Sequence, residues 1–277
     1  EDAGKLIHPD DKSDPHSYVD LNRCGTPLIE IVSEPDMRSV EEAKLFLTEL
    51  RSILRFVGVS DGNMEEGSLR CDVNISLRPR GETQYGTRAE IKNMNSFSGV
   101  SKALEYEIKR QSEALQAGET IIQETRLFDT ESGTTRSMRS KENAPDYRYF
   151  PDPDLVPIVL EESYINKLQE ELPELPTARK ERFRKEYELN DLAARTLCAS
   201  PELADYFEKA VEGFASQPKK IASWIQAEVL RVLNERQMAI QDFPVPPEEI
   251  SRLFILQEDG TISGKIAKKV FALMVER

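Results

Sequence analysis

The pattern of apolar residues changes near residue 160, and this change constrains the fold more than any other feature of the chain. Before it, short alternating segments are separated by Gly and Pro; from about Ser163 onward, long helical patterns dominate. Strand and helix patterns in separate halves are typical of an α+β protein. We therefore predict an antiparallel-sheet domain over residues 1–160 and an all-α helical domain over residues 161–277.

Several helices are predicted from apolar residues at helical spacing and from their boundary signals. Ser39 and Glu42 form a capping box that begins a helix ending near Val57, and Gly58 follows it. A second helix is expected over 98–117, before Gly118. The helices expected in the second half are 177–188, 190–198, 201–214, 218–236, 247–256 and 263–275.

Alternation of apolar and polar residues predicts β-structure in the first half. Residues 69–77 and 87–92 alternate on either side of a turn, which predicts an antiparallel hairpin with one apolar and one polar face. A second hairpin is expected from 121–128 and 134–139, and a single strand over 26–34. Residues 146–157 contain three prolines and are expected to form a structured loop.

The polar face of the first hairpin is the strongest candidate site. Three polar side chains from each strand emerge on that face: Arg70, Asp72 and Asn74 from one strand, and Arg88, Glu90 and Lys92 from the other. Such a surface is either a solvated outer face or a binding face for a metal and phosphate. The following junction, residues 93–97, contains amides that could bind an anion at a helix N-terminus.

Glu30 interrupts the apolar run 28–32, where an unpaired buried carboxylate would be costly. It either faces water at a strand edge or points at a cation.

The charge and cysteine content limit the possible functions. The net charge of −13 argues against nucleic-acid binding through the overall field, so any RNA contact needs a local basic patch or a partner. Two such patches are possible, one over 179–185 and one over 265–269, although a solvated helix surface is the simpler interpretation of both. Three scattered cysteines indicate reduced thiols, as expected in the cytoplasm. The chain has neither an initial Met nor a finished last helical pattern, so we expect a fragment.

Six stretches resemble the B/E subunit (GatB/GatE) family of tRNA-dependent amidotransferases. They are EDAGK at the start, VDLNRCGTPLIEIVSEPD (19–36), MEEGSLRCDVNISLRP (64–79), EIKNMNSF (90–97), DYRYFPDPDLVP (146–157) and DGTISGKIAKKVF (259–271). The resemblance implies a cradle-like catalytic domain in a ligase of three subunits. In that family the B subunit uses ATP to phosphorylate the glutamate or aspartate of Glu-tRNA(Gln) or Asp-tRNA(Asn). Ammonia from the amidase A subunit then displaces the phosphate, and a small C subunit joins A to B.

The resemblance also implies roles for individual residues. The family pattern makes Glu1, Glu30 and Glu90 the candidate ligands of Mg²⁺, which prefers oxygen. The catalytic candidates are Arg70, Asp72 and Lys92, and the candidates for binding ATP and the acceptor are Asn74, Arg88, Asn93 and Ser96. The family's opening segment, which carries a metal-binding histidine, and its distal tail domain are expected to be missing. Two alternatives are a non-catalytic tRNA-binding scaffold within the same complex and a stand-alone metal-binding protein.

Overall fold

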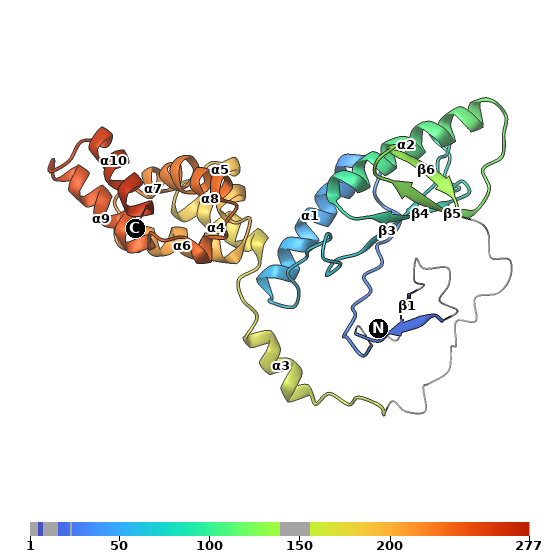
Figure 1. Cartoon of the computed structure of the whole chain (residues 1–277), viewed down its shortest axis with the longest axis horizontal. Helices are drawn as coiled ribbons and strands as arrows, with labels where there is room; N and C mark the ends of the chain where they lie inside the picture. The colour runs from blue at the N-terminus through green and yellow to red at the C-terminus, as the bar shows by residue number, and fades with distance from the viewer. Residues whose placement is uncertain (1–4, 8–15, 23, 139–155, 277) are drawn as a thin grey trace. The chain divides into compact units, whose positions relative to one another are not determined.

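The computed structural model describes residues 5–7, 16–22, 24–138 and 156–276 (Figure 1). The chain divides into two compact units, residues 1–38 and 39–277. In the first unit, β1 (Lys5–Ile7) pairs antiparallel with β2 (Tyr18–Asp20). Glu1 and most of the predicted loop 146–157 lie outside the described residues.

The strand predicted over 26–34 is wrong, because these residues pair with no strand in the described chain. The segment remains open to solvent: Ile29 is 68% exposed and Val32 is 81% exposed, and Glu30 is exposed as well. A strand requires a neighbour for its backbone N–H and C=O groups, and an apolar sequence does not supply one.

Four strands of the second unit form one sheet in the order β3-β4-β5-β6. Both predicted hairpins are present: β3 (Cys71–Ile75) is antiparallel to β4 (Ala89–Met94), and β5 (Glu124–Asp129) is antiparallel to β6 (Thr134–Ser137). However, β4 and β5 run parallel, so the sheet is mixed and not wholly antiparallel. The reason is α2 (Phe97–Gln116), which connects β4 to β5 and returns the chain to the same end of the sheet.

The first of the two helices beside this sheet begins at the predicted cap. In α1 (Val40–Phe56), the Ser39 hydroxyl accepts from the backbone N–H of Glu42 at 3.1 Å, and two glutamates in the first turn suit the helix dipole. Both helices and the sheet share a core, and α2 contacts β3, β4 and β6 (Figure 1). The buried residues of this shared core are Leu47, Ile91, Met94, Val100, Ala103, Leu104 and Phe128.

The second half is helical, as predicted, and every predicted helix is present within a few residues. The helices are α3 (Glu162–Glu170), α4 (Pro176–Glu186), α5 (Asp191–Leu197), α6 (Pro201–Glu212), α7 (Pro218–Trp224), α8 (Leu230–Arg236), α9 (Pro247–Glu258) and α10 (Gly264–Val275). The predicted helix 218–236 contains a π-helical segment, η1 (Ile225–Val229), between α7 and α8. A short 3-10 helix, η2 (Ile240–Asp242), follows.

Helices α4 to α10 pack around a large apolar core of their own. Aromatic rings meet edge to face within it: the centroids of Trp224 and Phe271 are 5.6 Å apart, and those of Trp224 and Phe254 are 5.5 Å apart. By contrast, α3 buries none of its side chains. No helix among the described residues has the length and apolar content needed to cross a bilayer.

Candidate active site on the open face of the sheet

The four-stranded sheet presents a polar surface on the side away from α2. On β4, Ala89 and Ile91 are fully buried toward the core, and the intervening Glu90 and Lys92 point the other way. We call this surface the open face and define it by Asp72, Asn74, Glu90, Lys92 and Thr125. The prediction that Asp72, Asn74, Glu90 and Lys92 share one sheet face is confirmed by the burial pattern and the strand register.

Lys92 joins two carboxylates on the open face. Its Nζ lies 2.7 Å from Asp72 Oδ2 on β3 and 3.2 Å from Glu90 Oε1 on its own strand. Partial burial lowers the pKa of Lys92, but hydrogen bonds to the two carboxylates raise it above its ordinary value overall. All three side chains are between a third and a half exposed, so the pairs contribute at most about 1 kcal/mol to folding. Their arrangement therefore makes little difference to stability and keeps a positive charge accessible to a ligand.

Glu90 is held from a second side by Thr125 of β5. The parallel register places the two residues opposite each other, and the Thr125 hydroxyl donates to Glu90 Oε2 at 2.7 Å. Partial burial raises the pKa of Glu90, but the hydrogen bonds from Thr125 and Lys92 and the charges of Lys92 and Arg88 lower it below its ordinary value. Glu90 is therefore an ionised carboxylate at neutral pH.

Asn93 shapes the strand beside Lys92. The register shifts between Cys71, which pairs with Met94, and Val73, which pairs with Ile91, so β4 carries one extra residue there. Asn93 adopts a left-handed backbone with φ of 72° at this bulge, and its side-chain amide donates to the backbone carbonyl of Phe128 at 3.1 Å. Bulges of this kind re-aim side chains next to functional sites.

The other predicted site residues fall into two groups. Asn74 is the direct cross-strand partner of Glu90, whereas Arg70 and Arg88 are exposed residues that precede β3 and β4. Ser96 caps α2, because its hydroxyl accepts from the backbone N–H of Gly99 at 3.0 Å. Asn93 and Ser96 thus have structural contacts, and their predicted contact with nucleotide stays a prediction.

The structure does not determine the positions of the three predicted metal ligands, Glu1, Glu30 and Glu90, relative to one another. Glu1 lies outside the described residues, and Glu30 belongs to the first unit while Glu90 belongs to the second. Among the described residues, no three His, Cys, Asp or Glu side chains gather as a metal site.

The donors on the open face nevertheless suit Mg²⁺, which commonly takes one or two carboxylates together with waters and substrate phosphates. Glu90 is ionised and one third exposed, and Asp72 lies on the other side of the Lys92 ammonium. Cys71 is no ligand candidate: burial, and then the charge of Asp72, raise the pKa of its thiol to about 11, so it stays protonated.

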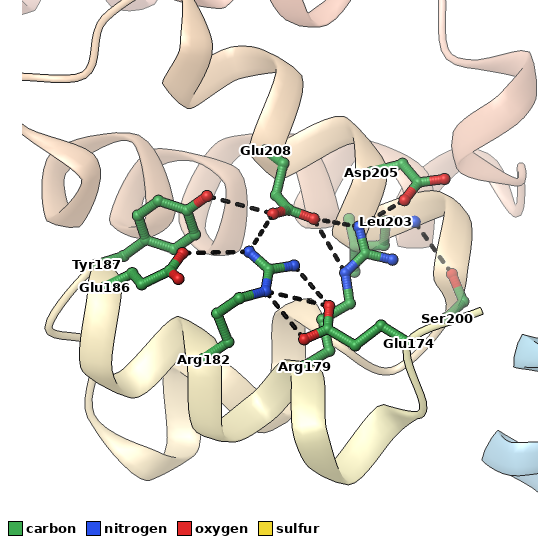
Figure 2. A network of polar contacts seen from close by, with 9 residues as sticks. All are labelled: Glu174, Arg179, Arg182, Glu186, Tyr187, Ser200, Leu203, Asp205 and Glu208. Atoms are coloured by element: carbon green, nitrogen blue, oxygen red, sulfur yellow. Dashed lines mark hydrogen bonds and ion pairs between the residues drawn. The ribbon is translucent and has the colours of Figure 1, made fainter. Parts of the chain in front are cut away.

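The basic cluster over 179–185 is engaged by acidic residues, so the structure favours a packing role for it over phosphate contact. Figure 2 shows Arg179 and Arg182 of α4 meeting Glu208 of α6. Arg179 also contacts Asp205, and Arg182 contacts Glu174 at 2.6 Å. Lys180 lies 2.8 Å from a carboxylate oxygen of Glu49 on α1.

Comparison with known proteins agrees with the family resemblance found in the sequence. The model of the GatB/GatE catalytic domain matches residues 1–166, and the GatB domain model matches residues 205–277. The chain is 54% identical to the B subunit of the aspartyl/glutamyl-tRNA(Asn/Gln) amidotransferase of Brachyspira hyodysenteriae, over 100% of this chain and 57% of that protein.

It is 53% identical to the protein of the same name from Carboxydothermus hydrogenoformans, over 99% of this chain and 57% of that protein. The identity to the one from Persephonella marina is 55%, over 98% of this chain and 56% of that protein. The chain thus spans a little over half the length of these curated relatives. Because the catalytic-domain match covers 166 of the 277 residues, the chain belongs to the GatB/GatE family.

Proposed function

We propose that this chain carries the ATP-dependent half-reaction of a tRNA-dependent amidotransferase. Its substrate is the side-chain carboxylate of a glutamate or aspartate esterified to tRNA(Gln) or tRNA(Asn), and its product is the corresponding amide. The observation that carries the proposal is the Asp72–Lys92–Glu90 group on the open face, within a stretch that matches the family's catalytic domain. The curated relatives are named as subunits of an aspartyl/glutamyl-tRNA amidotransferase, in agreement with this reaction.

The chemistry explains why such a surface needs both charges. A carboxylate resists attack by ammonia because it is anionic and has no good leaving group. Its oxygen therefore attacks the γ-phosphorus of ATP, the bond to ADP breaks, and an acyl phosphate forms. Ammonia then attacks the acyl carbon, the C–O bond to phosphate breaks, and the nitrogen loses a proton to solvent. Bound Mg²⁺ would offset the negative charge that this encounter brings together.

The residues of the open face have different roles in this reaction. Lys92, kept protonated by Asp72 and Glu90, is the cation that attracts phosphate or acceptor carboxylate. Arg70 and Arg88 supply further positive charge at the starts of β3 and β4, and Asn74 offers an amide next to Glu90. Glu90 would be the ligand that this part of the chain contributes to Mg²⁺, together with Glu30 and Glu1 as the family pattern implies.

Partners follow from the same proposal. The amidase A subunit supplies ammonia, the small C subunit joins A to B in a heterotrimer, and a mischarged Glu-tRNA(Gln) or Asp-tRNA(Asn) is the acceptor. The net charge of −13 makes the overall field repulsive toward tRNA, so we expect the partners and the rest of the full-length protein to contribute to its binding. The proposed reaction takes place in the cytoplasm, where aminoacylated tRNA is used.

The proposal is tested with Glu90→Gln in the full-length protein assembled with its A and C subunits. Glu131 on the β5–β6 turn is exposed and allows a matched control, Glu131→Gln. We expect Glu90→Gln to reduce ATP-dependent amide formation on Glu-tRNA(Gln) about 100-fold or more, with tRNA binding unchanged and the control fully active. Full activity of Glu90→Gln and of Glu30→Ala would contradict the catalytic role and favour a tRNA-binding scaffold.

A further inference from the structure

The geometry points to Thr125 as the positioning residue of the site, which holds the Glu90 carboxylate in the orientation that binds the divalent cation. This inference rests on the proposed function, because it assumes that Glu90 is a ligand. It adds a residue from β5, a strand on which the sequence analysis named no site residue.

The contact itself is specific. The Thr125 hydroxyl donates to Glu90 Oε2 at 2.7 Å. The opposite oxygen, Oε1, lies 3.2 Å from the Lys92 ammonium. Among the described residues, each oxygen thus contacts one polar group, and a carboxylate oxygen has a further lone pair for a ligand.

The Thr125 hydroxyl also counteracts the electrostatic attraction of the Glu90 carboxylate to the Lys92 ammonium. That ammonium lies between Glu90 and Asp72, so without Thr125 the Glu90 side chain is free to rotate and pair with Lys92 through either or both oxygens. Such a rotation would use the lone pairs that a divalent cation needs. Thr is well suited to prevent it, because its branched side chain is restricted at χ1 and sits on a strand whose register fixes it opposite Glu90.

The experiment measures Mg²⁺ binding to the full-length protein by calorimetry, without ATP or tRNA, in four variants. Thr125→Val removes the hydroxyl and keeps the branched shape, and Thr125→Ser restores the hydroxyl. Thr134→Val makes the same change on β6, where the hydroxyl lies 2.8 Å from that of Ser132. Glu90→Gln removes the proposed ligand itself.

We expect Thr125→Val to weaken Mg²⁺ binding about 10-fold, as is usual when a group that orients a metal ligand is lost. Thr125→Ser should bind Mg²⁺ with an affinity within about threefold of that of the unsubstituted protein. Thr134→Val should bind Mg²⁺ as tightly as the unsubstituted protein. All four variants should have the same Tm as the unsubstituted protein. The Mg²⁺ concentration for half-maximal amide formation should rise in parallel for Thr125→Val.

Two results would overturn the inference, and they are distinguishable. If Glu90→Gln loses Mg²⁺ binding while Thr125→Val binds normally, Thr125 has no positioning role and the proposed function stands. If Glu90→Gln binds Mg²⁺ normally, the metal assignment in the proposed function fails, and the role of Thr125 fails with it.

Discussion

At the scale of single residues, backbone conformation decides how the open face is assembled. Asn93 is one of the described non-glycine residues with positive φ, a region that costs most L-residues about 1–2 kcal/mol. Asn tolerates this conformation better than most, and here its amide also bonds the Phe128 carbonyl on β5. The residue therefore fixes the bulge that sets Lys92 opposite Asp72 and ties β4 to β5.

Substitution of Asn93 tests this explanation. Asn93→Ala loses the hydrogen bond and strains the backbone, so we expect it to lower the free energy of unfolding by about 2 kcal/mol. Asn93→Gly loses the same hydrogen bond without the strain and should cost only about 1 kcal/mol. Urea denaturation of both variants measures the difference. Equal losses in the two variants would show that the left-handed backbone is not what selects Asn here.

At the scale of elements, a buried ionic cluster fastens α2 to the sheet. The carboxylate of Glu107 is fully buried, with Arg126 Nε of β5 at 2.9 Å and a guanidinium nitrogen of Arg110 at 2.8 Å. Thr135 of β6 and Gln111 also donate to it. Burial raises the pKa of Glu107, but the hydrogen bonds from Arg110, Thr135 and Gln111 lower it below its ordinary value. Removing one member would leave buried charge unpaired.

We predict that Glu107→Gln lowers the free energy of unfolding by about 3 kcal/mol at pH 7. Because the folded pKa lies below the ordinary value of 4.5, this stabilisation is complete above pH 4.5 and is lost as the pH falls through the folded pKa. The difference in the free energy of unfolding between the unsubstituted protein and Glu107→Gln should therefore become smaller at acidic pH. Urea titrations at pH 7 and at successively lower pH measure it. A difference independent of pH would indicate that the lost contact is not ionic.

At the scale of the whole molecule, the second unit contains two apolar cores, one between the sheet and helices α1 and α2, and one among helices α4 to α10. Ion pairs also connect α1 with the helical region, such as Lys180 with Glu49 at 2.8 Å and Arg55 with Glu202 at 3.3 Å. These pairs are partly exposed, so each contributes about 1 kcal/mol or less. Most of the stability of the helical region should therefore come from its own core.

This reasoning makes the predicted domain boundary at residue 160 testable. We expect a protein of residues 161–277 to fold alone, with a helical circular dichroism spectrum and one cooperative thermal transition. The ion pairs lost from α1 should lower its Tm by only a few degrees. A broad transition without cooperativity would show that the helical region depends on the first 160 residues.

Much of this fold and part of its site can be predicted from the sequence alone. The helices of the second half, the capping of α1 and both hairpins follow from local patterns, because spacing and caps act within a few residues. The same alternation placed Asp72, Asn74, Glu90 and Lys92 on one face of the sheet. The family followed from long, unusual strings of residues.

Only the tertiary structure decided how these pieces meet. The parallel pairing of β4 with β5 joins residues 35 positions apart, and it brought Thr125 to Glu90; a strand–helix–strand pattern was the one signal that hinted at it. From the sequence, the arginines of α4 were either a solvated helix surface or a phosphate-binding patch, and the structure instead places carboxylates of α6 against them. Segment 26–34 had the composition of a strand but has no strand partner in the described chain. Local patterns set the conformation and the faces of each element, whereas long-range contacts determine which faces meet and which charges are neutralised.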